Sequence, residues 1–381
     1  MPPAHVMKLH SLNVSKTILS KQTFSSKNAR LRYLSTSALP RPFRFHVGAS
    51  WAGKQPDTQQ RRVKTLPFPK DSEIGAWRDQ TLSRPKASSS GRHIGEDFFY
   101  VQDMRKQSGV SLGIADGVGG WVDAGVDPSL FSQALMYHAH RYAKVSWPGE
   151  PETDPNLDYE EREQVDGWEL TPQECMELAH GQVLREHFVK AGSSTACIVN
   201  LNAANGILRS ANLGDSGFCI IRSSNVIYNQ APQTHFFNCP KQLTKLPSTG
   251  FTRGLHDTAQ DADLYETNVV DGDIIVLYTD GFSDNVFPSE TAAICSLISR
   301  QFTPPPAPKE LDADAEDPPE PQEDAQVQVM ADRLVDYAQM CMVNKKRVSP
   351  FERAAAREGL FYRGGKMDDV TVVVALVCET Q

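Results

Sequence analysis

The sequence predicts an α+β domain in which two packed sheets are covered by helices. Many short runs rich in β-branched and aromatic residues alternate with turn signals such as Asn205-Gly206. Stretches with helical periodicity are instead gathered in a few places, at about 127–142, 171–190 and 327–358. The length of 381 residues would allow two domains, but the composition of the ends and of one insertion favours a single one.

The N-terminal segment, residues 1–56, has the composition of a mitochondrial presequence. It contains nine Lys or Arg residues, many Ser and Thr, and no Asp or Glu. The stretch 32–35 resembles a processing site, and residues 57–90 read as a flexible lead-in of mixed Pro, Ser and charge. The alternative for the first segment is a basic disordered tail. On this interpretation the domain proper covers residues 91–381.

Charge, hydropathy and cysteine content exclude several classes of protein. The chain carries a net charge of −8, so the residues after 56 carry −17, which argues against a nucleic-acid partner. No apolar run approaches the ~18 residues that a membrane span requires, so we expect a soluble protein. Seven widely spaced cysteines without a Cys-x-x-Cys pair predict reduced thiols, mostly buried.

Four predicted strands carry acidic residues at their ends. These are Glu96 and Asp97 before 98–101, Asp116 after 110–115, Asp280 after 274–279, and Asp368 and Asp369 before 370–377. Carboxylates beside buried strands suit hard, oxygen-ligated cations, and no His or Cys cluster accompanies them. The pattern therefore predicts Mg²⁺ or Mn²⁺ rather than Zn²⁺. A single Asp-Gly pair at a strand end would equally fit a simple turn.

The helices are predicted from their start signals. Asp127-Pro128 begins one helix, and capping boxes at 171–174 and 349–352 begin two others, which end near Lys190 and before Gly359. His138 and His140 lie on different faces of the first helix, so we expect surface residues and not metal ligands. Residues 195–228 are predicted to form an antiparallel meander of short strands.

An acidic, proline-rich insertion is predicted at 303–325. It contains seven prolines, eight acids and one lysine. Such a segment cannot bury enough apolar surface to order itself, so we expect it to be disordered.

The acidic strand ends belong to an ordered series of motifs that resembles the metal-dependent protein phosphatases of type 2C. The series is Gly95-Glu96-Asp97, Ala115-Asp116-Gly117-Val118-Gly119-Gly120, Gly192-Ser193-Ser194-Thr195, Asn212-Leu213-Gly214-Asp215-Ser216-Gly217, Thr279-Asp280-Gly281 and Asp368-Asp369-Val370-Thr371. Residues 234–240, together with Val118, further resemble the mitochondrial branch of that family. The resemblance covers residues 91–378.

This resemblance implies a four-layer α-β-β-α sandwich of two antiparallel sheets flanked by helices, with a metal site at one end between the sheets. Two Mg²⁺ or Mn²⁺ ions would activate a shared water to attack phosphoserine or phosphothreonine. The implied metal ligands are Asp116 as the bridging and catalytic carboxylate, the Gly117 carbonyl, Glu96 for one ion, Asp280 and Asp368 for the other, and Asp215 for a weaker third ion. Asp97 and Asp369 would orient waters and strand ends.

Phosphate binding also requires a cation. The resemblance favours Arg92, four residues before Glu96, because its planar guanidinium suits two phosphate oxygens. A surface arginine is the alternative, and Lys366 and Arg253 are weaker candidates. Residues 235–246 are predicted to form a flap beside the cleft that helps to select substrates.

The sequence therefore predicts a mitochondrial, matrix-located, monomeric phosphatase that acts on phosphoproteins. Mitochondrial metabolic enzymes or enzymes of coenzyme Q biosynthesis are the substrates that the resemblance suggests. Two alternatives are a hydrolase of small phosphate esters and a pseudophosphatase that binds a partner. The second would require loss of a metal ligand, and all the expected ligands are present.

Overall fold

The computed structural model describes residues 41–54, 67–83, 93–149, 168–247, 257–302 and 322–380. Within these ranges, most strands belong to two five-stranded antiparallel sheets. The first sheet has the order β1 (Phe43–Ala52), β14 (Val370–Glu379), β13 (Ile274–Tyr278), β7 (Gly217–Arg222) and β8 (Asn225–Asn229). The second has the order β12 (Asp263–Asn268), β6 (Ile207–Leu213), β5 (Ala196–Asn202), β3 (Gly109–Asp116) and β2 (Asp97–Asp103).

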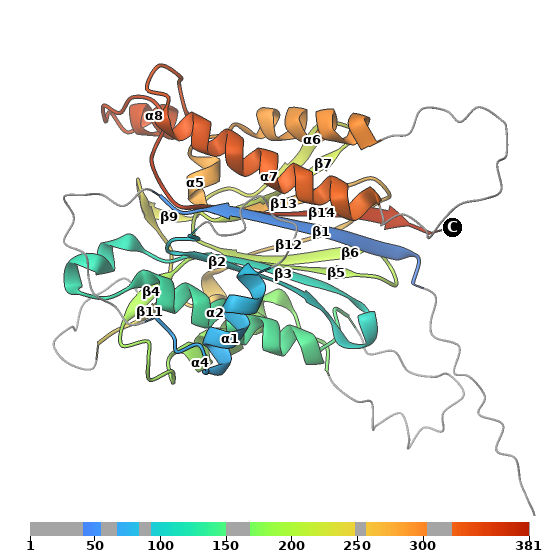
Figure 1. The fold of residues 1–381 in the computed structure, drawn as a ribbon, viewed down its shortest axis with the longest axis horizontal. Helices are drawn as coiled ribbons and strands as arrows, with labels where there is room; N and C mark the ends of the chain where they lie inside the picture. Colours follow the sequence, from blue (N-terminus) through green and yellow to red (C-terminus); the bar gives the residue numbers. More distant parts are fainter. Residues whose placement is uncertain are drawn as a thin grey trace, which may run out of the picture. The chain divides into compact units, whose positions relative to one another are not determined.

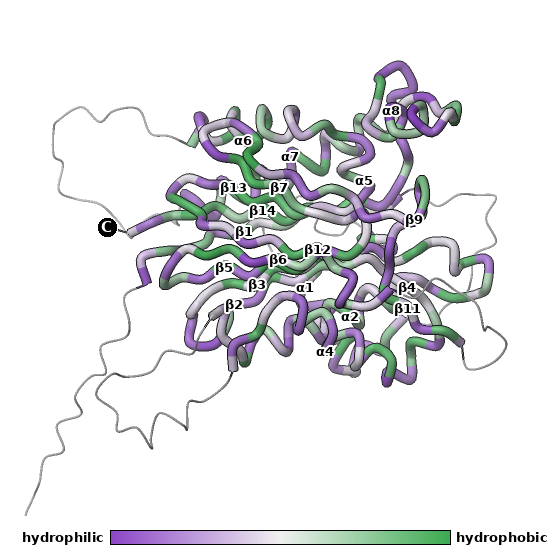
Figure 2. Tube along the Cα trace, turned by 180° about the vertical axis from the view of Figure 1, so that it is seen from behind, coloured by the Kyte–Doolittle hydropathy of each residue, from purple (hydrophilic) through white to green (hydrophobic). Residues whose placement is uncertain are grey.

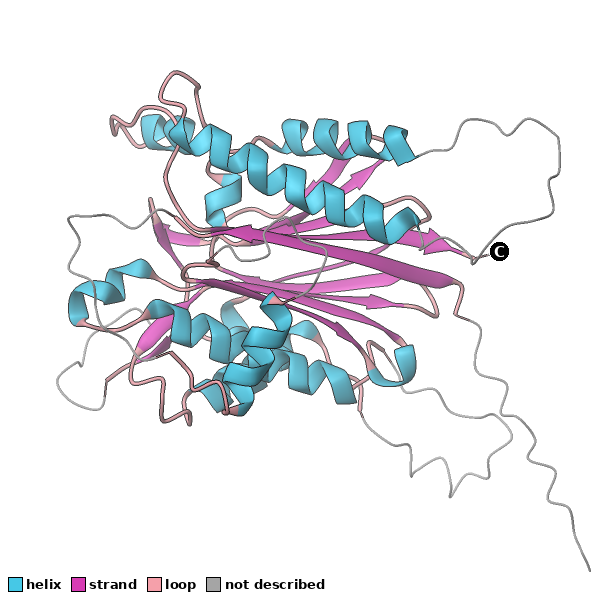
Figure 3. Cartoon of the chain, viewed as in Figure 1, coloured by secondary structure: helices cyan, strands magenta, loops and turns pink. Residues whose placement is uncertain are grey.

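Helices cover the outer face of each sheet, which produces four layers (Figures 1 and 3). The first sheet is covered by α6 (Pro288–Phe302) and α7 (Gln322–Val343), and the second by α1 (Glu73–Leu82), α2 (Pro128–Val145) and α4 (Pro172–Val183). Two short helices, α5 (Asp280–Ser283) and α8 (Pro350–Arg357), lie on the side of the first sheet. The predicted α-β-β-α sandwich is confirmed.

The central strands β13 and β14 of the first sheet are almost entirely apolar because both of their faces are buried. In β14, Val373, Ala375 and Val377 pack into the core between the sheets. The alternate residues of the same strand, such as Val372 and Val374, pack instead against α7. This period-two division explains the unbroken hydrophobic run of β14. Figure 2 shows the hydrophobic residues concentrated in these layers.

The domain begins earlier than the sequence predicted. Strand β1 pairs with β14 along all ten of its residues, and the Trp51 ring contacts Phe99 of the other sheet with 5.4 Å between ring centroids. Helix α1 lies in the predicted lead-in and packs on α2. The prediction that the domain starts at residue 91 is therefore wrong. Basic side chains on the outward positions of β1 concealed its alternating apolar pattern, whose inward residues include Ala49 and Trp51.

The meander prediction is wrong in its connectivity. Strands β5 and β6 lie in the second sheet, whereas β7 and β8 lie in the first, so the chain crosses between sheets at 214–216. The alternation of apolar residues is the same on both sides of this crossing, and it does not reveal which sheet a strand joins.

Helix α2 buries more polar side chains than predicted. His138 is only 7% exposed and its Nε2 lies 3.0 Å from Glu186 Oε1, while His140 stacks on Trp77 of α1. Neither is a free surface residue, because α1 and the segment after α4 cover this part of α2. Both rings make contacts within the protein, so the prediction that they are surface residues is wrong.

Three details of the predicted helices differ in the structure. Helix α4 ends at Val183 and not near Lys190. At the start of α8, Ser349 Oγ accepts from Glu352 N, but Glu352 accepts from Gly364 N and so does not close the predicted capping box. Helix α7 includes residues 322–325 of the predicted insertion, and residues 303–321 lie outside the described part.

The thiols and the hydropathy of the helices were also predicted from the sequence. All seven cysteines are free thiols, five of them buried, as predicted. Among the described helices, none is both long enough and apolar enough to cross a membrane. The segments 1–40 and 55–66, which include most of the predicted presequence, lie outside the described residues.

Candidate active site

The predicted acidic residues come together at one end of the two sheets. Glu96 and Asp116 come from the second sheet, at the start of β2 and the end of β3. Asp280 and Asp368 come from the first sheet, at the start of α5 and just before β14, and Asp215 lies in the crossing between the sheets. Opposed strand ends thus place five carboxylates from distant parts of the chain within electrostatic reach of one another.

The Asp116 turn is held by a dense set of backbone contacts. Asp116 N donates to Thr195 Oγ1 over 3.1 Å, and the Asp116 carbonyl accepts from Ser194 Oγ over 2.7 Å. Gly117 N donates to the Glu96 carbonyl over 3.1 Å. A Cβ at Gly117 would lie 2.6 Å from the Pro128 carbonyl oxygen, so only glycine allows this close approach.

Asp369 joins the two sheets beneath the carboxylates. Its Oδ1 accepts from Lys54 N over 2.7 Å and its Oδ2 accepts from Glu96 N over 2.9 Å. Gly95 has φ +78°, and a Cβ there would lie 2.0 Å from Asp369 Oδ1. Asp97, the first residue of β2, is fully buried and accepts a hydrogen bond from Thr279 Oγ1, just after β13, over 2.8 Å. Both acids therefore hold strand ends in place, which is the kind of contact predicted for them.

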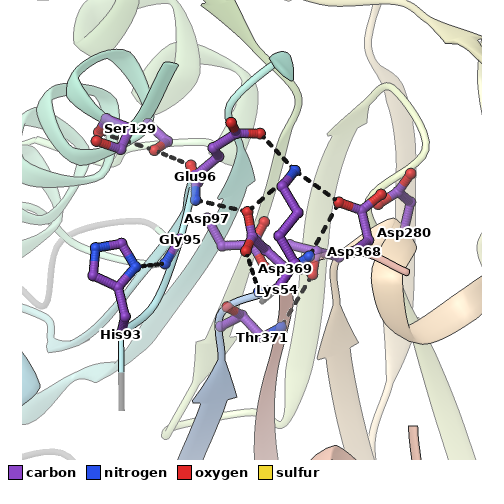
Figure 4. A network of polar contacts seen from close by, with 12 residues as sticks. Lys54, His93, Gly95, Glu96, Asp97, Ser129, Asp280, Asp368, Asp369 and Thr371 are labelled. Carbon is purple, nitrogen blue, oxygen red and sulfur yellow. Dashed lines mark hydrogen bonds and ion pairs between the residues drawn. The ribbon is translucent and has the colours of Figure 1, made fainter. Parts of the chain in front are cut away.

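Lys54 is a member of the site that sequence reasoning missed. Its Nζ lies 3.0 Å from Glu96 Oε2, 3.3 Å from Asp368 Oδ1 and 3.6 Å from Asp369 Oδ2 (Figure 4). Burial alone would lower the Lys54 pKa, but these carboxylates outweigh it and raise the pKa well above its usual range. Recognising β1 as a strand would have revealed Lys54, because it follows that strand by two residues.

Lys366 has a matching position on the other side of the cluster. Its Nζ lies 2.7 Å from both Asp280 Oδ2 and Asp284 Oδ2, and 3.4 Å from Asp368 Oδ2. Asp284, in the turn after α5, was not predicted as a site residue. Burial raises the pKa of Asp284 to about 7 although the Lys366 ammonium opposes this shift.

The remaining carboxylates are poorly compensated. Burial and the nearby charges of Asp280 and Asp97 raise the pKa of Asp116 well above its usual range, and burial together with Asp280 does the same for Asp215. Burial also tends to raise the pKa of Asp280, but the Lys366 ammonium has the larger effect, so the pKa of Asp280 is lowered. Such crowding of like charges is costly unless a cation lies among them.

The donor set fits a hard divalent cation. Oδ1 of Asp280 is buried without a hydrogen-bond partner among the described residues, and two ammonium groups already act as cations between the acids. In the described ranges, no three Asp, Glu, His or Cys side chains form a ready-made metal cluster. Lys54 and Lys366 occupy the spaces between the carboxylates, so ion binding would require these two side chains to move.

The remaining predicted residues are two arginines and the flap. Arg92 and Arg253 fall outside the described residues. The predicted flap at 235–246 includes β9 (Thr234–Phe236), β10 (Cys239–Pro240) and β11 (Leu243–Lys245). Strand β11 pairs with β4 (Gly192–Ser194), whose last residue contacts the Asp116 carbonyl. The flap is thereby connected to the Asp116 turn.

Comparisons with known proteins agree with this geometry. No family model matches the chain. The chain is 32% identical over 317 residues to a Drosophila mojavensis protein named protein phosphatase PTC7 homolog fig, covering 83% of this chain and 88% of that protein. It is 33% identical over 289 residues to the Homo sapiens protein phosphatase PTC7 homolog, covering 76% and 81%. The X-ray structure of the photosystem II phosphatase PBCP superposes with a TM-score of 0.54 at 26% identity, covering 87% and 98%.

Proposed function

Because the chain belongs to the type 2C family of protein phosphatases and is a protein serine/threonine phosphatase, we propose that it dephosphorylates mitochondrial phosphoproteins with two bound Mg²⁺ or Mn²⁺ ions. The observation that carries the metal proposal is the carboxylate cluster drawn from both sheets. A phosphate dianion would be repelled by this cluster unless cations neutralised it. Two lysines alone do not balance the acids that face them.

We assign the metal ligands as the sequence resemblance implies. Glu96, Asp116 and the Gly117 carbonyl would hold one ion, with Asp116 shared by both, while Asp280 and Asp368 would hold the other. Asp215 is the ligand proposed for a weaker third ion. The bound ions would supply Lewis-acid polarisation of the phosphate and of the attacking water.

The protein's own residues have distinct tasks in this proposal. Asp97 and Asp369 hold the strand ends that carry the ligands, through Thr279 and Glu96 N. Arg92 remains the proposed phosphate-binding residue. Lys54, which is more than a third exposed beside Glu96 and Asp368, is a second cation that can reach an incoming phosphate once ions neutralise its present partners.

Location and substrates are also proposals. The acid-free basic segment before residue 41 supports mitochondrial import to the matrix. Metabolic enzymes and enzymes of coenzyme Q biosynthesis are the proposed substrates, on the resemblance to the mitochondrial branch alone. We propose a monomer. Hydrolysis of small phosphate esters is the second candidate, because the carboxylate cluster does not by itself select proteins.

The test uses the purified full chain with phosphoserine, phosphothreonine and small phosphate esters. We expect release of phosphate from both peptides only with Mn²⁺ or Mg²⁺, and at higher kcat/KM than from sugar phosphates. Independently of activity, Mn²⁺ at 100 times its Kd should stabilise the fold by about 2.7 kcal/mol, which is measured as a rise in Tm. An unchanged Tm and metal-independent turnover would refute the metal assignment, and preference for small esters would favour the second candidate.

A further inference from the structure

A groove of about 440 Å³ lies directly beside the candidate active site. Lys54 and Asp368 of the site form part of its lining. The rest of the lining is Gly53, Met367 and residues of α7 near its C-terminus, of which Asp336 and Gln339 are polar and Met340, Met342 and Val343 are apolar. Its volume is within the range of about 300–1,000 Å³ that is typical of ligand pockets.

The fold does not account for the apolar side chains of this groove. Helix α7 buries a separate face against the first sheet, with Leu334, Ala338 and Cys341. Met340 and Val343 lie one turn apart on another face, and each is 67% exposed. Met367 is 44% exposed immediately before Asp368. Three large apolar residues thus meet in solvent next to the carboxylates, without contributing to the core.

The position of this groove determines what could occupy it. A phosphorylated residue whose phosphate reaches Asp368 and Lys54 brings the adjoining residues of its chain to the groove. An extended peptide advances about 3.3 Å per residue, so the occupant must lie within a few residues of the phosphorylated one. We expect its side chain to be apolar, because Met340, Val343 and Met367 are exposed apolar residues of the lining and an apolar side chain would remove them from water.

We propose that this groove binds an apolar side chain of the substrate close to its phosphoserine or phosphothreonine. Met340, Val343 and Met367 are then specificity-determining residues. Because methionine is unbranched and adaptable, the groove accepts several aliphatic or aromatic side chains and not a single one. The substrate class is an extended phosphorylated segment with a neighbouring apolar residue. This inference rests on the proposed phosphatase function.

The experiment moves one leucine through positions −4 to +4 of a phosphoserine peptide made otherwise of glycine and serine. For the full-length protein with Mn²⁺, we expect kcat/KM at one or two positions to exceed that of the leucine-free peptide about tenfold, mainly through KM. Met340→Asp and Val343→Asp should each reduce this ratio to near one. Met340→Leu should retain it. Leu297→Asp is the matched control, because Leu297 is 60% exposed on α6 and does not line the groove.

Each result has a defined meaning. The inference is overturned if leucine gives no advantage at any position, or if the advantage survives both aspartate substitutions. It is also overturned if Leu297→Asp removes the advantage equally. A protein that cleaves neither peptides nor nitrophenyl phosphate would instead refute the proposed function. Tm measurements on every variant identify any that fails to fold. If one of the two aspartate variants fails to fold, the other still tests the inference.

Discussion

Asp116 and Asp280 show at the scale of single residues why a catalytic cluster is costly to fold. Their negative charges would hold a cation, yet they repel each other without one. We predict that Asp116→Asn and Asp280→Asn each reduce turnover at saturating Mn²⁺ to less than about a tenth. The Tm of metal-free Asp116→Asn should stay constant or rise, because one repelling charge is removed, whereas metal-free Asp280→Asn loses the ion pair with Lys366 and should melt at a lower temperature.

Asp103→Asn is the control for these variants. Asp103 is exposed at the opposite end of β2, so its substitution should change neither turnover nor Tm. Phosphate release and thermal melting with and without Mn²⁺ measure both quantities. More than a tenth of the wild-type rate in both site variants would contradict the assignment of two metal ions.

Val118 occupies the position where many type 2C phosphatases have a histidine that can protonate the departing oxygen. Valine cannot transfer a proton. A positioned general acid contributes about 10²- to 10⁴-fold, and it matters most for a poor leaving group such as the serine alkoxide. We predict that Val118→His raises the rate on phosphoserine peptides relative to nitrophenyl phosphate. The two substrates are compared across pH for both proteins.

The alternative is that Val118 only packs in its turn. Val118 is half-buried, and its N–H donates to the Ser193 carbonyl. The hydroxyl of Ser193 accepts a second hydrogen bond, from Trp121 Nε1. Histidine would then misplace Asp116 and lower both rates together. An unchanged ratio of the two rates would therefore remove the argument for a missing acid.

At the scale of elements, the contact between β1 and α7 depends on one glycine. A Cβ at Gly48 would lie 2.6 Å from the backbone of residues 327 and 328 in α7, which cannot move aside as a side chain can. We predict that Gly48→Ala destabilises the fold by about 1–3 kcal/mol, as overpacking does. Chemical denaturation measures the loss.

Gly181→Ala is the matched control at this scale. Gly181 lies within α4, and a Cβ there would meet nothing within 4 Å. Alanine is about 1 kcal/mol better than glycine in a helix, so this variant should be more stable than the wild type. Equal stability of Gly48→Ala and the wild type would mean that β1 does not press against α7 as described.

At the scale of the whole molecule, the described part of the chain begins two residues before β1. We predict that residues 1–40 fused to a soluble reporter carry it into mitochondria, because basic, acid-free segments respond to the inward-negative potential. Changing Lys8, Lys16, Lys21, Arg30 and Arg32 to Gln should leave the reporter in the cytosol, as imaging or fractionation would show. Import of the substituted reporter would disprove the targeting prediction.

Much of the fold and site could be predicted because their signals are local. Asp116 and Asp280 each follow an apolar run and precede a glycine, so their place at strand ends is visible in a few residues. The family resemblance then predicted the four-layer arrangement of helices and sheets. Lys54 and Asp284 could not be predicted in this way, because their roles depend on partners more than 40 residues away, Lys54 on Glu96 and Asp284 on Lys366.

The sequence by itself determined most of the strands, the acids at their ends and the family, since periodicity and motif order are properties of short segments. Only the tertiary structure decided that β1 completes the first sheet, that β6 and β7 lie in different sheets, and that two lysines lie among the carboxylates. It also placed Met340 and Val343 beside Asp368. Each of these features depends on pairing between distant segments. A hydrophobic pattern is compatible with several such pairings, and packing of the whole chain selects one of them.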